Sequence, residues 1–245
     1  MRHVFNRFVL WLGGHDYLVL IAVLLIVGGV WGFIALMDEV REGATQHFDE
    51  WAIRTIGAYN GPPMLEEIGR DITALGGVTV LTLVTLAVAG YLHLQRKWGA
   101  LIFLLIATVG GAVLSGVLKH FVDRPRPDLV PHRSYVVTTS FPSGHSMLSA
   151  VVYLTLGALL ARFTRDLRLR VYFLSLALTM TFLVGVSRVY MAVHWPTDVL
   201  AGWTAGCVWA ILCWTVARIL QQRGAVEKEI NTRVPGPPES EKAAD

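Results

Sequence analysis

Cysteine is scarce in this sequence, and the two that occur cannot bond to each other. Cys207 and Cys213 fall six positions apart in one apolar segment. On a helix that rises about 1.5 Å per residue they would be about 9 Å apart along the axis, which is too far for a disulfide. We expect both to be small packing residues, so they give no indication of the redox compartment.

A continuous basic stripe is also missing, although the net charge is +3. Lys and Arg residues stand instead at the ends of apolar runs. Proteins that bind nucleic acid concentrate positive charge on one face or along one helix. We therefore exclude nucleic acid as a partner. No internal repeat is visible either, and the length suits a single domain.

Apolar residues are what the sequence has in abundance. They make up 54% of the 245 residues, and the mean hydropathy is +0.53. Soluble domains are rarely so apolar, whereas proteins that span a membrane commonly are. We therefore expect an integral membrane protein that resides in a lipid bilayer.

Six apolar segments are long enough to cross a bilayer, which takes about 20 residues. They cover approximately residues 17–37, 72–94, 98–118, 146–163, 169–188 and 197–220. The first is too long for a signal peptide and lacks a convincing cleavage site, so we expect a retained helix. The prediction is an all-α, polytopic six-helix bundle at residues 1–221, followed by a disordered cytoplasmic tail at residues 222–245.

The charges of the loops predict the orientation, because short cytoplasmic loops are enriched in Lys and Arg. One side of the predicted spans collects most of the basic residues, namely Arg2, Arg7, Arg96, Lys97, Arg162, Arg165, Arg168, Arg170, Arg218 and Arg223. We expect this side, with both termini, to be cytoplasmic. The compact plan and the outward site described next favour a bacterial inner membrane.

An acidic segment, residues 38–71, falls on the outer side. Within it, Phe48, Trp51, Ala52 and Ile56 are spaced like the apolar face of a short helix at the membrane interface. We expect this helix to cover the edge of the bundle. A role in gating the substrate is the alternative.

Two outer loops depart from the charge pattern by carrying basic residues. The loop between the third and fourth spans contains Lys119 and Arg126 and ends near Ser143, Gly144 and His145. The loop between the fifth and sixth spans runs from Arg188 through His194 to Asp198. Both loops follow an odd-numbered span, so they lie at the same face. Ionisable residues so close to hydrocarbon indicate function.

These residues suit phosphoryl transfer. Lys119, Arg126 and Arg188 would supply positive charge, and a guanidinium can clamp phosphate oxygens with paired N–H donors. Ser143 and Gly144 stand where the fourth span starts, and the N–H groups at a helix start favour an anion. This cradle would also stabilise the charge of the transition state.

The nucleophile that we predict is His194. Asp198 lies four residues further on, across the start of a helix, and can accept a hydrogen bond from one imidazole nitrogen. The other nitrogen would then attack phosphorus, and His145 would protonate the leaving oxygen. The sequence shows no Asp/Glu cluster for a divalent metal, and the cations would repel one. We therefore expect neither a metal nor a cofactor.

These three clusters resemble, in order and in spacing, the three-part signature of the type-two phosphatidic acid phosphatase superfamily. The resemblance covers residues 119–198 by motif and the rest of the bundle by its six-helix plan. It implies His194 as nucleophile, Asp198 as its partner and His145 as acid. The phosphate cradle that it implies consists of Lys119, Arg126, Ser143, Gly144 and Arg188. Arg124 and Asp123 fall in the variable stretch of the first motif, where we expect them to pair with each other.

The function that we predict is hydrolysis of a lipid phosphate or diphosphate through a phosphohistidine, with the site on the outer side. Substrates implied by the resemblance are undecaprenyl diphosphate, phosphatidylglycerol phosphate and phosphatidic acid, and the first or a broad bacterial specificity is favoured by analogy. Lipid A dephosphorylation and phosphotransfer to an acceptor other than water are alternatives with the same site.

Two other functional classes agree less well with the sequence. A non-catalytic binder of lipid phosphate would need the cations but would leave His194, Asp198 and His145 without a purpose. A soluble haloperoxidase that holds vanadate in a similar cradle is disfavoured by the six spans. The sequence gives no indication of the oligomeric state.

Overall fold

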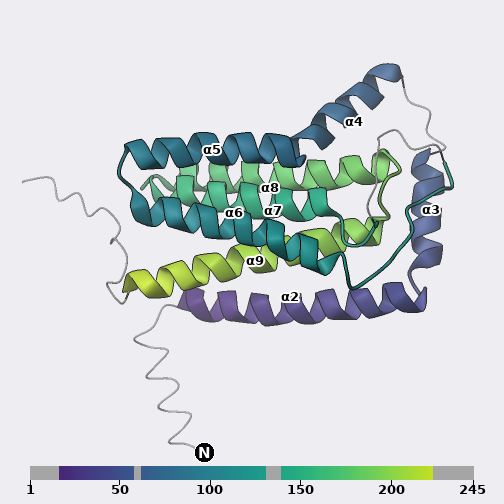
Figure 1. The fold of residues 1–245 in the computed structure, drawn as a ribbon, viewed down its shortest axis with the longest axis horizontal. Coiled ribbons are helices and arrows are strands. Elements are labelled where there is room, and N and C mark those ends of the chain that lie inside the picture. The colour runs from purple at the N-terminus through teal and green to yellow at the C-terminus, as the bar shows by residue number, and fades with distance from the viewer. Residues whose placement is uncertain (1–16, 58–61, 131–138, 223–245) are drawn as a thin grey trace, which may run out of the picture.

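The computed structural model describes residues 17–57, 62–130 and 139–222, which form eight helices and no strand. Five of these helices are long and apolar enough to cross a membrane by length and composition. They are α2 (Tyr17–Glu42), α6 (Trp98–Leu118), α7 (Gly144–Arg162), α8 (Leu167–Tyr190) and α9 (Pro196–Gln222). Together with α5 (Val78–Leu94) they run lengthwise in one bundle (Figure 1). The all-α membrane prediction is confirmed.

Helix α7 is the centre of the bundle. It contacts α5, α6, α8 and α9, and half of its most apolar stretch is buried inside the protein, against 6% for that of α2. Its interior positions include Ser146, Ser149, Thr155 and Gly157. Small side chains of this kind let neighbouring helices approach closely, because packing and not hydrophobicity holds helices together inside lipid.

Helices α7 and α9 approach each other closely. Gly202 and Gly206 lie one turn apart on α9 and face the backbone of α7. A Cβ atom on Gly202 would come within 2.6 Å of the Ser143 carbonyl oxygen, and one on Gly206 within 2.6 Å of the Met147 carbonyl oxygen. This approach draws the start of α7, with Ser143, against the start of α9.

The second predicted span differs from expectation, because it is bent. Helix α4 (Pro63–Leu75) ends and α5 begins at a 49° bend, so residues 72–75 belong to α4 and lie before the bend. Gly76 and Gly77 occupy the bend. A Cβ atom on Gly76 would collide with Val184 of α8. Counting the bent pair as one span gives the predicted six.

The predicted interfacial helix is present as α3 (Gln46–Gly57), at the end of the bundle where α6, α7, α8 and α9 meet (Figure 1). Its apolar residues do not share one environment, however. Phe48 and Trp51 are exposed, whereas Ala52 is buried together with the charged residue Asp49. The exposed aromatic rings suit the polar–apolar boundary of a membrane. The buried carboxylate of Asp49 is turned away from solvent.

Some predicted features cannot be compared with the structure. The tail at residues 223–245, together with Arg2, Arg7 and Arg223, lies outside the described residues. Gln222, with which we began the tail, is the last residue of α9. Cys207 and Cys213 both lie on α9 and both are free thiols.

The close approach of α7 and α9 can be tested by adding one methyl group. Gly206→Ala should destabilise the protein by about 1–3 kcal/mol, because the new Cβ has no space, and should lower the melting temperature in detergent. Gly90→Ala is the matched control, since no atom lies within 4 Å of a Cβ there and Ala favours a helix. Equal melting temperatures for the two variants would contradict this packing.

Candidate functional site

Four helix ends meet at one end of the bundle and carry the predicted site residues. Lys119 follows the last residue of α6, and His145 lies in the first turn of α7. Arg188 lies in the last turn of α8, and Asp198 lies in the first turn of α9. His194 precedes α9 by two residues. The convergence expected from the parity of the spans is therefore present in the fold.

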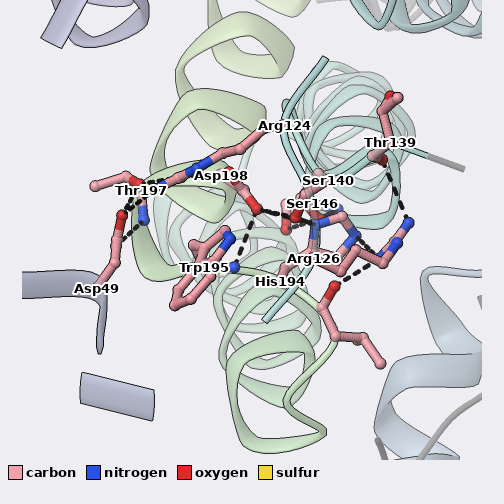
Figure 2. Close-up of polar contacts among 12 residues, drawn as sticks. Asp49, Arg124, Arg126, Thr139, Ser140, Ser146, His194, Trp195, Thr197 and Asp198 are labelled. Atoms are coloured by element: carbon pink, nitrogen blue, oxygen red, sulfur yellow. Dashed lines mark hydrogen bonds and ion pairs between the residues drawn. The ribbon is translucent and has the colours of Figure 1, made fainter. Parts of the chain in front are cut away.

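His194 and Asp198 form a buried pair. The Nδ1 atom of His194 lies 3.4 Å from Oδ2 of Asp198, and their side chains are 2% and 0% exposed. Oδ2 also accepts a hydrogen bond from the Trp195 backbone N–H at 3.0 Å and another from the Ser140 hydroxyl. The carboxylate thus faces one imidazole nitrogen from a position held by two further donors (Figure 2).

The second imidazole nitrogen of His194 points to the other side. Its Nε2 atom lies 3.2 Å from Nη1 of Arg126. A guanidinium has only donors, so Nε2 is the acceptor and the proton of a neutral imidazole sits on Nδ1, beside Asp198. Burial lowers the pKa of His194 to about 4, against the opposing effect of Asp198. The imidazole is therefore neutral at pH 7, with its lone pair directed toward Arg126.

Arg126 and Lys119 are held by the same backbone carbonyl. Both donate to the Thr139 oxygen, Lys119 at 3.2 Å and Arg126 at 3.4 Å, and Arg126 also donates to the Val193 oxygen at 2.5 Å. Burial lowers the pKa of Lys119 to about 8, and the neighbouring Arg126 acts in the same direction. Burial also lowers the pKa of Arg126. Two crowded, partly desolvated cations favour an anion between them.

Arg188 is the most deeply buried of the three cations, at 2% exposure. Its Nη1 lies 3.4 Å from the hydroxyl oxygen of Thr73 on α4. Its Nε has no hydrogen-bond acceptor among the described residues. A buried donor without an acceptor is costly, and an oxygen of a bound anion would satisfy it.

The start of α7 supplies further donors. The Ser143 hydroxyl oxygen accepts from the Ser146 hydroxyl at 2.9 Å and from its N–H at 3.4 Å, which caps the helix. The Ser143 backbone N–H is used for the Asp198 carbonyl oxygen at 3.0 Å. Among the described contacts the Ser143 hydroxyl only accepts, so we expect its hydrogen to be available to an anion. A Cβ atom on Gly144 would lie 3.5 Å from Cε of Lys119, so the backbone runs directly beside this cation.

His145 lies within electrostatic reach of the same cations and of His194. Unlike His194 it is only partly buried. The bend between α4 and α5 covers it, since a Cβ atom on Gly77 would lie 3.9 Å from its Nε2. All eight predicted site residues therefore lie in one region, and their individual roles stay predictions.

One expectation about the first motif is wrong. Arg124 does not pair with Asp123. It donates to Asp198 at 2.7 Å and to Asp49 of α3 at 2.7 Å. A neighbour in the chain was the only partner that the sequence suggested, whereas both real partners come from helices far away along the chain.

Three more residues of this region escaped prediction, namely Asp49, Ser140 and Thr197. Asp49 is 0% exposed and lies among the acidic residues of the outer segment. Nothing in its spacing distinguishes it from Glu50. Thr197 was visible only as the residue before Asp198, and Ser140 stands outside every motif. In the part of the chain that the structure describes, no group of three or more His, Cys, Asp or Glu side chains could hold a metal ion.

The chain is similar in sequence to a family of known proteins. Residues 99–221 match the family model described as the PAP2 superfamily. Phosphatidylglycerophosphatase B of Bacillus subtilis (strain 168) is 36% identical over 180 residues, which is 71% of this chain and 85% of that protein. Lipid A 1-phosphatase of Rhizobium etli is 29% identical over 183 residues, 64% of this chain and 73% of that one.

A solved structure extends the likeness to the fold. The crystal structure of a transmembrane PAP2 type phosphatidylglycerolphosphate phosphatase from Bacillus subtilis superimposes with a TM-score of 0.75 at 30% identity. The match covers 80% of this chain and 98% of that one.

The lowered pKa of Lys119 predicts how anion binding depends on pH. Sulfate, whose charge is constant between about pH 6 and 10, should bind with constant affinity up to about pH 8. Above that pH Lys119 is neutral in the protein without bound sulfate, and the affinity should fall by up to about tenfold per pH unit. Lys119→Arg, which stays charged, should keep its affinity in this range. Titration calorimetry in detergent measures the sulfate affinity of the wild-type protein and of the variant at each pH. The same pH dependence in both proteins would contradict a role for Lys119 in binding the anion.

Proposed function

The chain belongs to the PAP2 superfamily, and from this premise we propose that it is a membrane phosphatase that hydrolyses a lipid phosphate through a phosphohistidine. One observation carries the proposal. A neutral, buried His194 has Nδ1 beside the Asp198 carboxylate and Nε2 directed at the cations. An imidazole lone pair aimed into an anion site is the arrangement that attack on phosphorus requires.

The reaction proceeds in two displacements. Nε2 of His194 attacks phosphorus, the bond from phosphorus to the lipid oxygen breaks, and His145 gives its proton to that oxygen. The phosphorylated imidazole carries a positive charge, which the Asp198 carboxylate stabilises through Nδ1–H. Water then attacks phosphorus, His145 takes a proton from it, and the phosphorus–nitrogen bond breaks. Lipid phosphate and water thus become lipid alcohol and inorganic phosphate.

The cradle acts in both displacements. Negative charge spreads over the equatorial oxygens in the transition state. Lys119, Arg126 and Arg188 come from three different segments and are held before substrate arrives, so little reorganisation is needed during the reaction. The Nε atom of Arg188, without an acceptor among the described residues, is one donor that a phosphate oxygen would satisfy.

The site is proposed to face the outside of the membrane. The loops at the opposite end of the bundle carry Arg96 and Lys97 between α5 and α6, and Arg165 between α7 and α8. Such basic loops are retained in the cytoplasm. The substrate would then approach from the outer leaflet, near the exposed rings of Phe48 and Trp51.

The lipid that we propose first is phosphatidylglycerol phosphate, because the relative named for that activity is aligned over most of its length. Undecaprenyl diphosphate, phosphatidic acid and lipid A are the competing substrates. Phosphate release from each, in mixed micelles, ranks them by kcat/KM. A phosphotransferase would consume lipid phosphate only when its acceptor is supplied, and the phosphoryl group would then appear on the acceptor and not as inorganic phosphate.

Replacing the nucleophile separates an enzyme from a binder. His194→Ala should reduce phosphate release at least about 1,000-fold, while sulfate affinity changes little, because the cations remain. His120→Ala is the matched control. His120 follows α6 like Lys119, but it is exposed and its ring contacts only the Gly116 oxygen in the described contacts. Release that persists in the His194 variant would overturn the phosphohistidine route.

Two inhibitors probe the chemistry further. Vanadate should inhibit, because a pentacoordinate adduct on His194 mimics the transition state. EDTA should leave the rate unchanged, because the cradle supplies its charge from side chains. Strong loss of activity in EDTA, restored by a divalent cation, would overturn the metal-independent mechanism.

A further inference from the structure

Arg124 bridges two buried carboxylates behind the site. Its Nη1 donates to Oδ1 of Asp198 at 2.7 Å, and its Nη2 donates to Oδ2 of Asp49 at 2.7 Å. The side chains are 8%, 0% and 0% exposed for Arg124, Asp198 and Asp49. The guanidinium also lies 5.3 Å from the ring of Trp195. A buried carboxylate needs such partners, because desolvation of an unpaired charge is expensive.

Asp49 also binds the start of α9. Its Oδ1 accepts from the Thr197 backbone N–H at 3.1 Å, and its Oδ2 accepts from the Thr197 hydroxyl at 2.6 Å. The Thr197 hydroxyl oxygen in turn accepts from Arg124 at 2.8 Å. A side chain of α3 therefore caps a helix that begins about 150 residues later in the chain.

The contacts that the structure describes between Asp49, Thr197 and Arg124 lie on the side of Asp198 away from the anion site. Figure 2 shows Asp49, Thr197 and Arg124 on one side of Asp198, and His194 with Arg126 on the other. The two carboxylate oxygens of Asp198 have different partners. Oδ1 receives Arg124, while Oδ2 faces His194, Ser140 and the Trp195 N–H. The carboxylate cannot rotate without losing contacts on both oxygens.

We propose that Asp49 and Arg124 are positioning residues, which hold Asp198, and through it His194, in the orientation for attack. Helix α3 then belongs to the machinery of the site and does more than cover the edge of the bundle. The inference rests on the proposed function. It predicts a loss in the attack step and not in anion binding, because none of the described contacts of Asp49 or Arg124 reaches Lys119, Arg126 or Arg188.

The test is Asp49→Asn, which keeps the size of the side chain and removes its charge. We expect kcat to fall about tenfold to a hundredfold, because even a small misplacement of the reacting groups slows a reaction by such factors. KM should stay within about twofold of the wild-type value. Vanadate affinity should fall by a similar factor, because its adduct needs an aligned His194. Sulfate affinity should not change. Arg124→Lys, which keeps a charge but not the fork, should retain more activity than Arg124→Met.

Glu50→Gln is the matched control. Glu50 is the next residue on α3, and its contacts are local, to Gln46 and Arg54. It should keep the wild-type kcat. If Asp49→Asn does not fold, Thr197→Val is tested in its place, because it removes only the hydroxyl that lies between Asp49 and Arg124. Its kcat should fall severalfold with KM unchanged.

Three outcomes overturn the inference. The first is wild-type kcat in the Asp49 variant, or in the Thr197 variant where that one is used. The second is parallel loss of vanadate and sulfate affinity, which indicates a general structural role. The third is equal activity of the two Arg124 variants. If wild-type protein hydrolyses no lipid phosphate, the proposed function fails, but the comparison of vanadate with sulfate affinity still decides the positioning role.

Discussion

The rest of this site depends on how the buried negative charge of the Asp198 carboxylate is compensated. Its 0% exposure would be prohibitively costly without compensation. Compensation comes from three segments: Arg124 and Ser140 of the loop before α7, the Trp195 N–H before α9, and indirectly Asp49 of α3. Satisfying this one charge draws together the segments that also carry the cations and His194.

The bundle is built to permit that convergence. Gly202 and Gly206 let α9 lie directly against the backbone of α7, so the Ser143 N–H can reach the Asp198 carbonyl oxygen. The bend at Gly76 lets α4 turn over the site, where Thr73 meets Arg188 and Ser187. Glycine at the helix contacts therefore permits both the close packing of the helices and the assembly of the site.

Much of the fold was predictable, because membrane spans follow from length and hydropathy alone. Five spans appear as single helices, and the interfacial helix is present as α3. The bend at Gly76 was missed, since the apolar pattern runs through it without interruption. The face of α3 could not be derived from its apolar residues either, because an ionic contact with Arg124 sets which side turns inward.

The sequence by itself determined which residues come together: His194, Asp198 and the cations stand at fixed spacings, and counting spans brings them to one end of the bundle. Only the tertiary structure decided which nitrogen of His194 faces which partner, and that Arg124 pairs with Asp49 and Asp198. The physical reason is distance along the chain. Spacing within a motif constrains neighbours on one helix, whereas Asp49 and Thr197 are 148 residues apart and meet only through packing.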